Sequence, residues 1–302
     1  MYSKDLPFDI FRENGEKFLA EYDEALEWMK GLGLPAIESR LGKYKIIVEN
    51  FGENLDLTKD DVASEQLFHE FLNAQMEIAE TIRIFHSLSN RDFDEFSQQL
   101  KKVTSGQPFR NTSKSDPSRD FLFELTMASR FIVGGFEVQL NQIADIVAVK
   151  DGFPKLFLEC KRIKSEKRIQ DNVKKANEQL KKRIAADKSK QCRGLAALNV
   201  NDLINPENDM IIVEDVNDLQ RLSSNSLANF VTKNERNLES KKTNKHLGIL
   251  VEATMQGYII ESGVHSTINC RGAKLYQYNN SNADSLALSK VGELISNQNI
   301  TR

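Results

Sequence analysis

Residues 143–161, IADIVAVKDGFPKLFLECK, contain two short apolar stretches on either side of a turn signal. Residues 142–149 and 155–161 each predict a β-strand, because they are rich in Val, Ile, Leu and Phe. Residues 151–154, DGFP, are typical of a turn. This stretch therefore predicts a buried antiparallel hairpin, and the surrounding elements extend from it in both directions.

Three charged residues interrupt the two apolar strands: Asp145, Glu159 and Lys161. A hairpin centred on Gly152 pairs Asp145 with Glu159, with their Cβ atoms about 5 Å apart. Glu159 and Lys161 are two residues apart and share one face of their strand. Because burying an unpaired charge is costly, these side chains need partners. The alternatives are a metal site and a structural ion pair with Lys161 or Arg162.

Two carboxylates and an ammonium on one face suit phosphodiester chemistry. Carboxylate oxygens are hard ligands that bind Mg²⁺ or Mn²⁺. Such a metal polarises a phosphodiester and lowers the pKa of a bound water. The ammonium of Lys161 can orient that water or stabilise charge on the phosphate. Glu124 lies on the preceding helix and is a candidate third ligand, with an exposed surface position as the alternative.

The elements around the hairpin follow a definite order. Residues 119–133 predict an amphipathic helix that Asp116 and Pro117 can begin and that Gly134-Gly135 ends. Residues 136–140 predict a strand before the hairpin. After the hairpin, residues 165–188 predict a long charged helix and residues 194–200 a buried strand.

Asp145 followed by Glu159-Cys160-Lys161 resembles the motif of the PD-(D/E)XK nuclease superfamily. This superfamily includes many restriction endonucleases, Holliday-junction resolvases and RecB-like nucleases. The order of elements over residues 118–200 is similar to its αβββαβ core. Glu124 matches the acid found on the first helix of many members, and Gln179 matches the helix glutamine of the RecB-like and resolvase-like branches.

The resemblance implies an α/β (α+β) fold with a restriction-endonuclease-like αβββαβ core and a helical N-terminal region. It implies a Mg²⁺-dependent (or Mn²⁺-dependent) nuclease, an endonuclease acting on DNA. The sequence departs from the family at Ala144, where the named proline would stand. The implied catalytic set is Asp145, Glu159, Lys161, Glu124 and Gln179, and Asp145, Glu159 and Glu124 would hold the metal.

Charge is distributed unevenly along the chain of 302 residues, whose formal net charge is −3. Residues 1–100 hold 10 Lys and Arg against 21 Asp and Glu, whereas residues 155–193 hold 14 against 5. A basic excess attracts phosphate, although a solvated helix face is the simpler alternative. Arg162, Lys164, Lys167 and Arg168 are the candidate nucleic-acid contacts, and the helix over 165–190 is expected to help hold the backbone.

The composition also suggests a division into domains. Residues 16–29, 61–88 and 91–103 predict helices, and residues 45–48 fit either a helical turn or a strand. The Ser-, Thr- and Pro-rich residues 106–117 predict a linker between an acidic helical domain, 1–105, and a nuclease domain, 118–302. The acidic domain is a poor match for nucleic acid. It is expected to contact a protein partner or form a homodimer.

The remaining residues predict elements but no further site. Residues 215–238 and 284–297 predict helices. Residues 246–253 and 258–262 predict strands that can form a hairpin, and residues 275–278 predict an edge strand.

Several function classes are excluded or disfavoured by the sequence. No apolar run is long enough to span a membrane, and no secretory signal is expected. Three cysteines without CxxC spacing favour the cytoplasm. There is no phosphate-binding GxxxxGK[ST] loop and no GxGxxG after a strand. A role in restriction or anti-phage defence rests on the resemblance alone. The rival hypothesis is a nuclease fold without catalysis that binds nucleic acid or protein.

Overall fold

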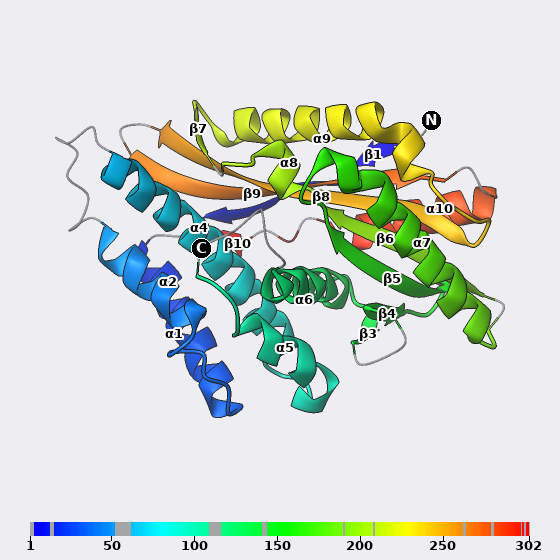
Figure 1. The fold of residues 1–302 in the computed structure, drawn as a ribbon, viewed down its shortest axis with the longest axis horizontal. Helices are drawn as coiled ribbons and strands as arrows, with labels where there is room; N and C mark the ends of the chain where they lie inside the picture. The colour runs from blue at the N-terminus through cyan, green and yellow to red at the C-terminus, as the bar shows by residue number, and fades with distance from the viewer. Residues whose placement is uncertain are drawn as a thin grey trace.

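The computed structural model is a mixed α/β fold with an open mixed sheet and helices on both of its faces (Figure 1). It describes residues 3–12, 15–51, 62–108, 116–140, 144–189, 191–207, 209–261, 264–278, 281–296, 298 and 300–301. Its first elements are β1 Ser3–Asp5, β2 Asp9–Arg12, α1 Gly15–Gly31, α2 Arg40–Glu49, α4 Val62–Leu88, η1 Phe93–Glu95 and α5 Ser97–Val103.

The middle of the chain forms the elements around the hairpin. They are α6 Pro117–Val133, β3 Glu137–Gln139, β4 Ile146–Val149, β5 Lys155–Arg162, η2 Glu166–Arg168, α7 Ile169–Ala186 and β6 Cys192–Asn199. Their order, helix, three strands, helix, strand, is the one predicted for residues 118–200. Pro117 occupies the first turn of α6 as expected, and the helix ends at Val133 before Gly134. Asp116 precedes the helix but its side chain forms no capping hydrogen bond, because it pairs with Arg119 instead.

The last third of the chain completes the sheet. Its elements are α8 Asn201–Ile204, β7 Met210–Val213, α9 Val216–Leu238, β8 His246–Glu261, β9 Val264–Gln277, α10 Asn282–Leu294 and β10 Ile300–Thr301. The described strands follow the order β10-β2-β9-β8-β6-β5-β4-β3, with β1 added beside β9 and β7 beside β8. Strands β5, β6 and β8 are parallel, and the β4–β5 and β8–β9 pairs are antiparallel.

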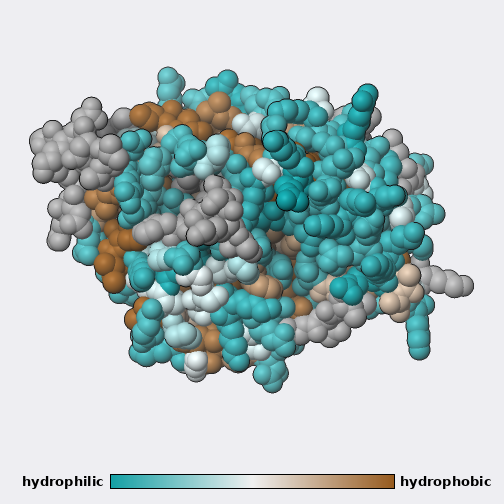
Figure 2. Space-filling model, in the orientation of Figure 1, coloured by the Kyte–Doolittle hydropathy of each residue, from teal (hydrophilic) through white to brown (hydrophobic). Residues whose placement is uncertain are grey.

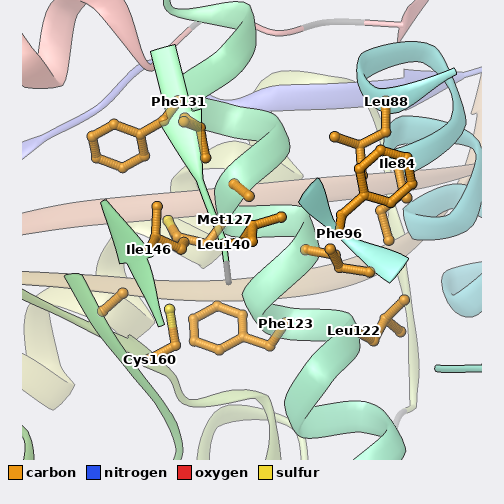
Figure 3. Close-up of a cluster of buried hydrophobic side chains, with 14 of the residues drawn as sticks. Ile84, Leu88, Phe96, Leu122, Phe123, Met127, Phe131, Leu140, Ile146 and Cys160 are labelled. Carbon is orange, nitrogen blue, oxygen red and sulfur yellow. The ribbon is translucent and has the colours of Figure 1, made fainter. Parts of the chain in front are cut away.

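Alternate residues of the central strands face two separate hydrophobic cores. Leu156, Leu158 and Cys160 of β5 pack on the side of α6, whereas Phe157 packs on the side of α7. Figure 3 shows Phe123 and Met127 of α6 in the same cluster as Ile146 and Cys160. Cys160 thus packs in the core on the face of β5 opposite Glu159. Glu159 thus interrupts the apolar row that faces α7.

Of the two alternatives for residues 45–48, the structure has the helical one. They lie in helix α2, which begins after Ser39, whose side chain accepts a hydrogen bond from the Leu41 backbone N–H. Other expected elements differ from the structure. The strands expected at 246–253 and 258–262 are one continuous strand, β8. Residues 275–277 belong to β9, which lies between β8 and β2 rather than at an edge.

The N-terminal region is not purely helical. Strand β1 pairs with β9, and β2 lies between β9 and β10. One buried cluster contains side chains from α1, α4, α6 and α10, so the two expected domains share a hydrophobic core. Residues 109–115 of the expected linker lie outside the described residues. The division into domains stays a prediction.

Candidate active site

The β4–β5 hairpin has the register that the sequence predicts. Ile146 pairs with Leu158 and Ala148 with Leu156, so the register extended by one residue sets Asp145 opposite Glu159. Asp145 lies just before β4, and its Oδ2 accepts a hydrogen bond of 2.7 Å from the backbone N–H of Cys160. This bond fixes the Asp145 carboxylate beside the end of β5.

The ammonium of Lys161 lies between the two carboxylates. Its Nζ is 3.7 Å from Asp145 Oδ2 and 3.5 Å from Glu159 Oε2. Burial lowers the pKa of Lys161, but the Asp145 and Glu159 carboxylates outweigh this effect and raise it above its ordinary value. Lys161 is therefore a fixed positive charge at the centre of the site.

Glu159 is the most deeply buried member of this group, with an exposed fraction of 0%. Burial and the neighbouring Asp145 carboxylate raise the pKa of Glu159 to about 7, against the opposing effect of Lys161 and Arg183. Neither of its carboxylate oxygens accepts a hydrogen bond. A buried carboxylate with unused acceptors is unusual in a folded protein and calls for a cation or a water.

Glu124 of α6 belongs to the same electrostatic group. Burial, and then the Asp145 carboxylate, raise the pKa of Glu124 to about 8, and Lys161 opposes this effect. Glu124 is half-buried and forms no hydrogen bond or ion pair with the described residues. Asp145 therefore influences both of the other expected acids, and both of these have raised pKa values.

The donor set fits a magnesium ion. Mg²⁺ is usually held by one or two carboxylates, with waters and substrate oxygens completing its shell. The Asp145–Glu159 pair supplies such ligands, and the Glu159 oxygens, which accept no hydrogen bond, already face the cationic groups of Lys161 and Arg183. Among the described residues, no group of three or more His, Cys, Asp or Glu side chains already forms a complete metal cluster.

Arg183 is a site residue that the sequence reasoning missed. Its Nε lies 3.7 Å from Glu159 Oε1, on the side of Glu159 that faces α7. Gln179 is half-buried and precedes Arg183 by four residues, so the two share one face of the helix. The four-residue spacing between Gln179 and Arg183 is the only signal for Arg183 in the sequence. Because α7 has many basic residues, only the packing of α7 against the sheet identifies Arg183 as the one that contacts Glu159.

The four expected nucleic-acid contacts differ in burial and in their ion pairs. The Arg162 side chain is 8% exposed and lies 3.3 Å from Asp202, 3.4 Å from Asp120 and 4.0 Å from Asp116. These ion pairs favour a structural role over the expected phosphate contact. Lys167 and Arg168 are exposed in η2, and Lys164 is half-buried before it.

Comparisons with protein-family models, curated proteins and solved structures find no match to this chain. In the described part of the chain, no helix has the length and apolar character needed to cross a membrane. The chemistry of the site therefore has to be inferred from its own residues.

Proposed function

We propose that this protein is a metal-dependent nuclease of the PD-(D/E)XK type that hydrolyses phosphodiester bonds of DNA. The observation that supports it best is the Asp145 and Glu159 pair on either side of Lys161. The order of elements from α6 to β6 also supports it, because it agrees with the αβββαβ order of the restriction-endonuclease-like core.

The residues of the site have distinct roles in this proposal. Asp145 and Glu159 would hold Mg²⁺ or Mn²⁺, and Glu124 would assist them once it is ionised. When bound, the metal would supply Lewis acidity that lowers the pKa of water and polarises the phosphodiester. Lys161 orients the attacking water and offsets the negative charge that develops on the phosphate. Arg183 favours the ionised form of Glu159.

The test is nicking of supercoiled plasmid with Mg²⁺, Mn²⁺ or EDTA. Asp145→Asn and Lys161→Ala should each lower the metal-dependent rate by about 10²–10³-fold, as the loss of a transition-state contact does. Lys155→Ala and Asp187→Asn are matched controls, because these two residues form a 2.7 Å ion pair at the other end of β5. Equal nicking by all five proteins would identify a contaminant and refute the proposal.

A second candidate function is a nuclease fold that binds without cutting. The observation that favours it is that Lys161 already lies within ion-pair distance of both carboxylates, at 3.5 and 3.7 Å, without a metal. A binding module should show no heat of Mn²⁺ binding in calorimetry and no metal-dependent nicking. The nuclease should bind Mn²⁺ with Asp145 intact and lose that binding in Asp145→Asn.

We further propose a cytoplasmic endonuclease in restriction or anti-phage defence. The three cysteines, Cys160, Cys192 and Cys270, are free and buried, which suits a reducing compartment. The acidic residues 1–105 would serve a protein partner or a homodimer rather than nucleic acid. Size-exclusion chromatography with light scattering tests the homodimer.

A further inference from the structure

Pairs of adjacent basic residues recur every seven residues in and before α7. They are Lys167-Arg168 in η2, and Lys174-Lys175 and Lys181-Lys182 in the helix itself. All six side chains are exposed. Seven residues are about two helical turns, so successive pairs lie on one face about 10.5 Å apart. We call these six residues the basic stripe.

The protein neutralises little of the charge on the basic stripe. Within the described residues, Lys174, Lys175, Lys181 and Lys182 form no ion pair, and Arg168 lies 3.9 Å from Asp171. Some exposed lysines elsewhere have partners, as in Lys30–Glu27, Lys233–Glu166 and Lys242–Glu239, whereas Lys43, Lys101 and Lys241 form no ion pair with the described residues. Uncompensated charge on a rigid element is typical of a surface that binds phosphate.

The basic stripe consists of two rows. Neighbouring residues of a helix are about 100° apart around its axis, so Lys174 and Lys181 form one row and Lys175 and Lys182 the other. Glu178 lies between the two rows, and so does Asp171, seven residues earlier in the chain. A single phosphate backbone facing this ridge would be repelled by the acids. Two backbones, one on each side of the ridge, would face only the lysines.

The dimensions of the helix agree with a groove between two backbones. An α-helix with its side chains is about 10–12 Å across, and the major groove of B-DNA is about 12 Å wide, whereas the minor groove is only about 6 Å wide. In Figure 1, α7 lies on the outside of the molecule, and Figure 2 shows a mainly hydrophilic surface in that region. The second row, Lys175 and Lys182, lies next to the face of the helix that carries Gln179 and Arg183. Arg183 contacts Glu159 of the candidate active site.

We propose that the basic stripe binds double-stranded DNA along its major groove, with each row against one phosphate backbone. This inference deepens the proposed nuclease function, on which it rests for its substrate class. The stripe spans two intervals of seven residues, about 21 Å, or about six base pairs of duplex. Helix α7 has no aromatic residue, whereas proteins that bind single strands generally stack bases on aromatic side chains.

The test measures binding without divalent metal, in EDTA, so that cleavage plays no part. Fluorescence anisotropy would follow a labelled DNA duplex several helical turns long over a series of salt concentrations. One variant combines Lys174→Gln with Lys181→Gln, and another combines Lys175→Gln with Lys182→Gln. The control combines Lys30→Gln with Lys290→Gln, which removes the same charge from exposed positions on α1 and α10.

Each row variant should reduce the slope of log K against log[salt] by about 1.8, or about 0.9 for each lost phosphate contact. The control should leave the slope unchanged, and all variants should keep the unfolding temperature of the parent protein. Double-stranded RNA of the same sequence should bind at least about tenfold more weakly, because its major groove is deep and narrow.

Three results would overturn the inference: row variants that match the control, equal and equally row-dependent binding of double-stranded RNA, or tighter binding of single strands. The two proposals fail separately. Row-dependent duplex binding without any nicking would refute the nuclease and leave the stripe as a DNA-binding surface. Normal nicking and binding by both row variants would refute the stripe and leave the nuclease.

Discussion

Glu159 is the most deeply buried carboxylate of the candidate site. It is fully buried, and its carboxylate oxygens accept no hydrogen bond. Its pKa of about 7 means that the folded protein keeps a proton on Glu159 over a pH range in which the unfolded chain has lost it. Ionisation of Glu159 in the folded, metal-free protein therefore lowers the free energy of unfolding.

Replacing Glu159 with Gln should stabilise the metal-free protein at alkaline pH. A carboxyl whose pKa is raised on folding makes the stability of the protein depend on pH. The free energy of unfolding falls as the pH rises from the unfolded pKa of the carboxyl, about 4.3, through its folded pKa. We expect Glu159→Gln to gain on the order of 1–3 kcal/mol at pH 8 and nothing at pH 4. Urea unfolding in EDTA at several pH values measures this. A gain of the same size at both pH values would contradict the assignment.

Removing Arg183 should move the pH dependence of nicking to higher pH. The guanidinium of Arg183 opposes the rise in the pKa of Glu159, so Arg183→Gln should raise that pKa further. The acidic limb of the pH–rate profile should shift upward, while the rate on the high-pH plateau changes little. Arg221→Gln is the control, because Arg221 is an exposed arginine of α9, outside both the candidate site and the basic stripe. An unchanged limb in Arg183→Gln would show that this contact does not influence the site.

Residue spacing predicts contacts within one hairpin better than contacts between elements that are distant in the sequence. The Asp145–Glu159 pairing follows from the two-residue period of a hairpin, and the structure has that register. The Glu159–Arg183 contact depends on how α7 packs against the sheet, which no local pattern contains. The structural ion pairs of Arg162 likewise come from α6 and α8.

At the scale of elements, the β4–β5 turn controls the alignment of the candidate site. Gly152 has φ of +80°, a conformation that disfavours side chains, and the Phe153 N–H donates to the Lys150 carbonyl across the turn. A slip of one residue in this hairpin would move Glu159 and Lys161 to the opposite face of the sheet.

Gly152→Ala should destabilise the protein by about 1–2 kcal/mol through backbone strain alone. A Cβ atom at this position meets no atom within 4 Å, so steric clash plays no part. Gly31→Ala is the matched control: its Cβ also meets nothing within 4 Å, but Gly31 is helical. That control should be neutral or slightly stabilising. Equal thermal unfolding of both variants would contradict the role given to the turn.

Long strands are harder to predict than helices from a local pattern. In β8, Gln256 and Gly257 interrupt the apolar sequence and lie in the gap between the two expected strands, 246–253 and 258–262. The strand continues because β7 and β9 pair with it on either side. Gln256 is 2% exposed there, and the close contact of Gly257 with the Leu219 side chain explains the glycine. Only the neighbouring strands decide between a break and a continuous strand.

At the scale of the whole molecule, a buried charge network joins distant segments. The Arg130 side chain of α6 is fully buried and lies 2.7 Å from Asp9 of β2 and 2.9 Å from Glu252 of β8. It also donates to the Ile295 carbonyl after α10. Burial raises the pKa of Asp9, but Arg130 and Arg271 outweigh this effect and hold it below its ordinary value.

Arg130→Met should destabilise the protein by about 3–5 kcal/mol, because it leaves two buried carboxylates without their partner. Arg221→Met is the control. Arg221 pairs with Asp218 on an exposed face of α9, where such a pair contributes about 0–1 kcal/mol. Denaturant titration of both variants measures the difference. A small effect of Arg130→Met would show that Arg271 alone neutralises Asp9.

The pairing of β1 and β2 with β9 has a consequence for biosynthesis. Residues 3–12 leave the ribosome long before their partner strand β9, at residues 264–277. At a synthesis rate of about 5–20 residues per second, the early strands wait roughly 13–50 s for β9. During that interval this nascent segment lacks its partner strand and can pair with the strands of other chains. The sheet can therefore be completed only after residues 264–277 have been made.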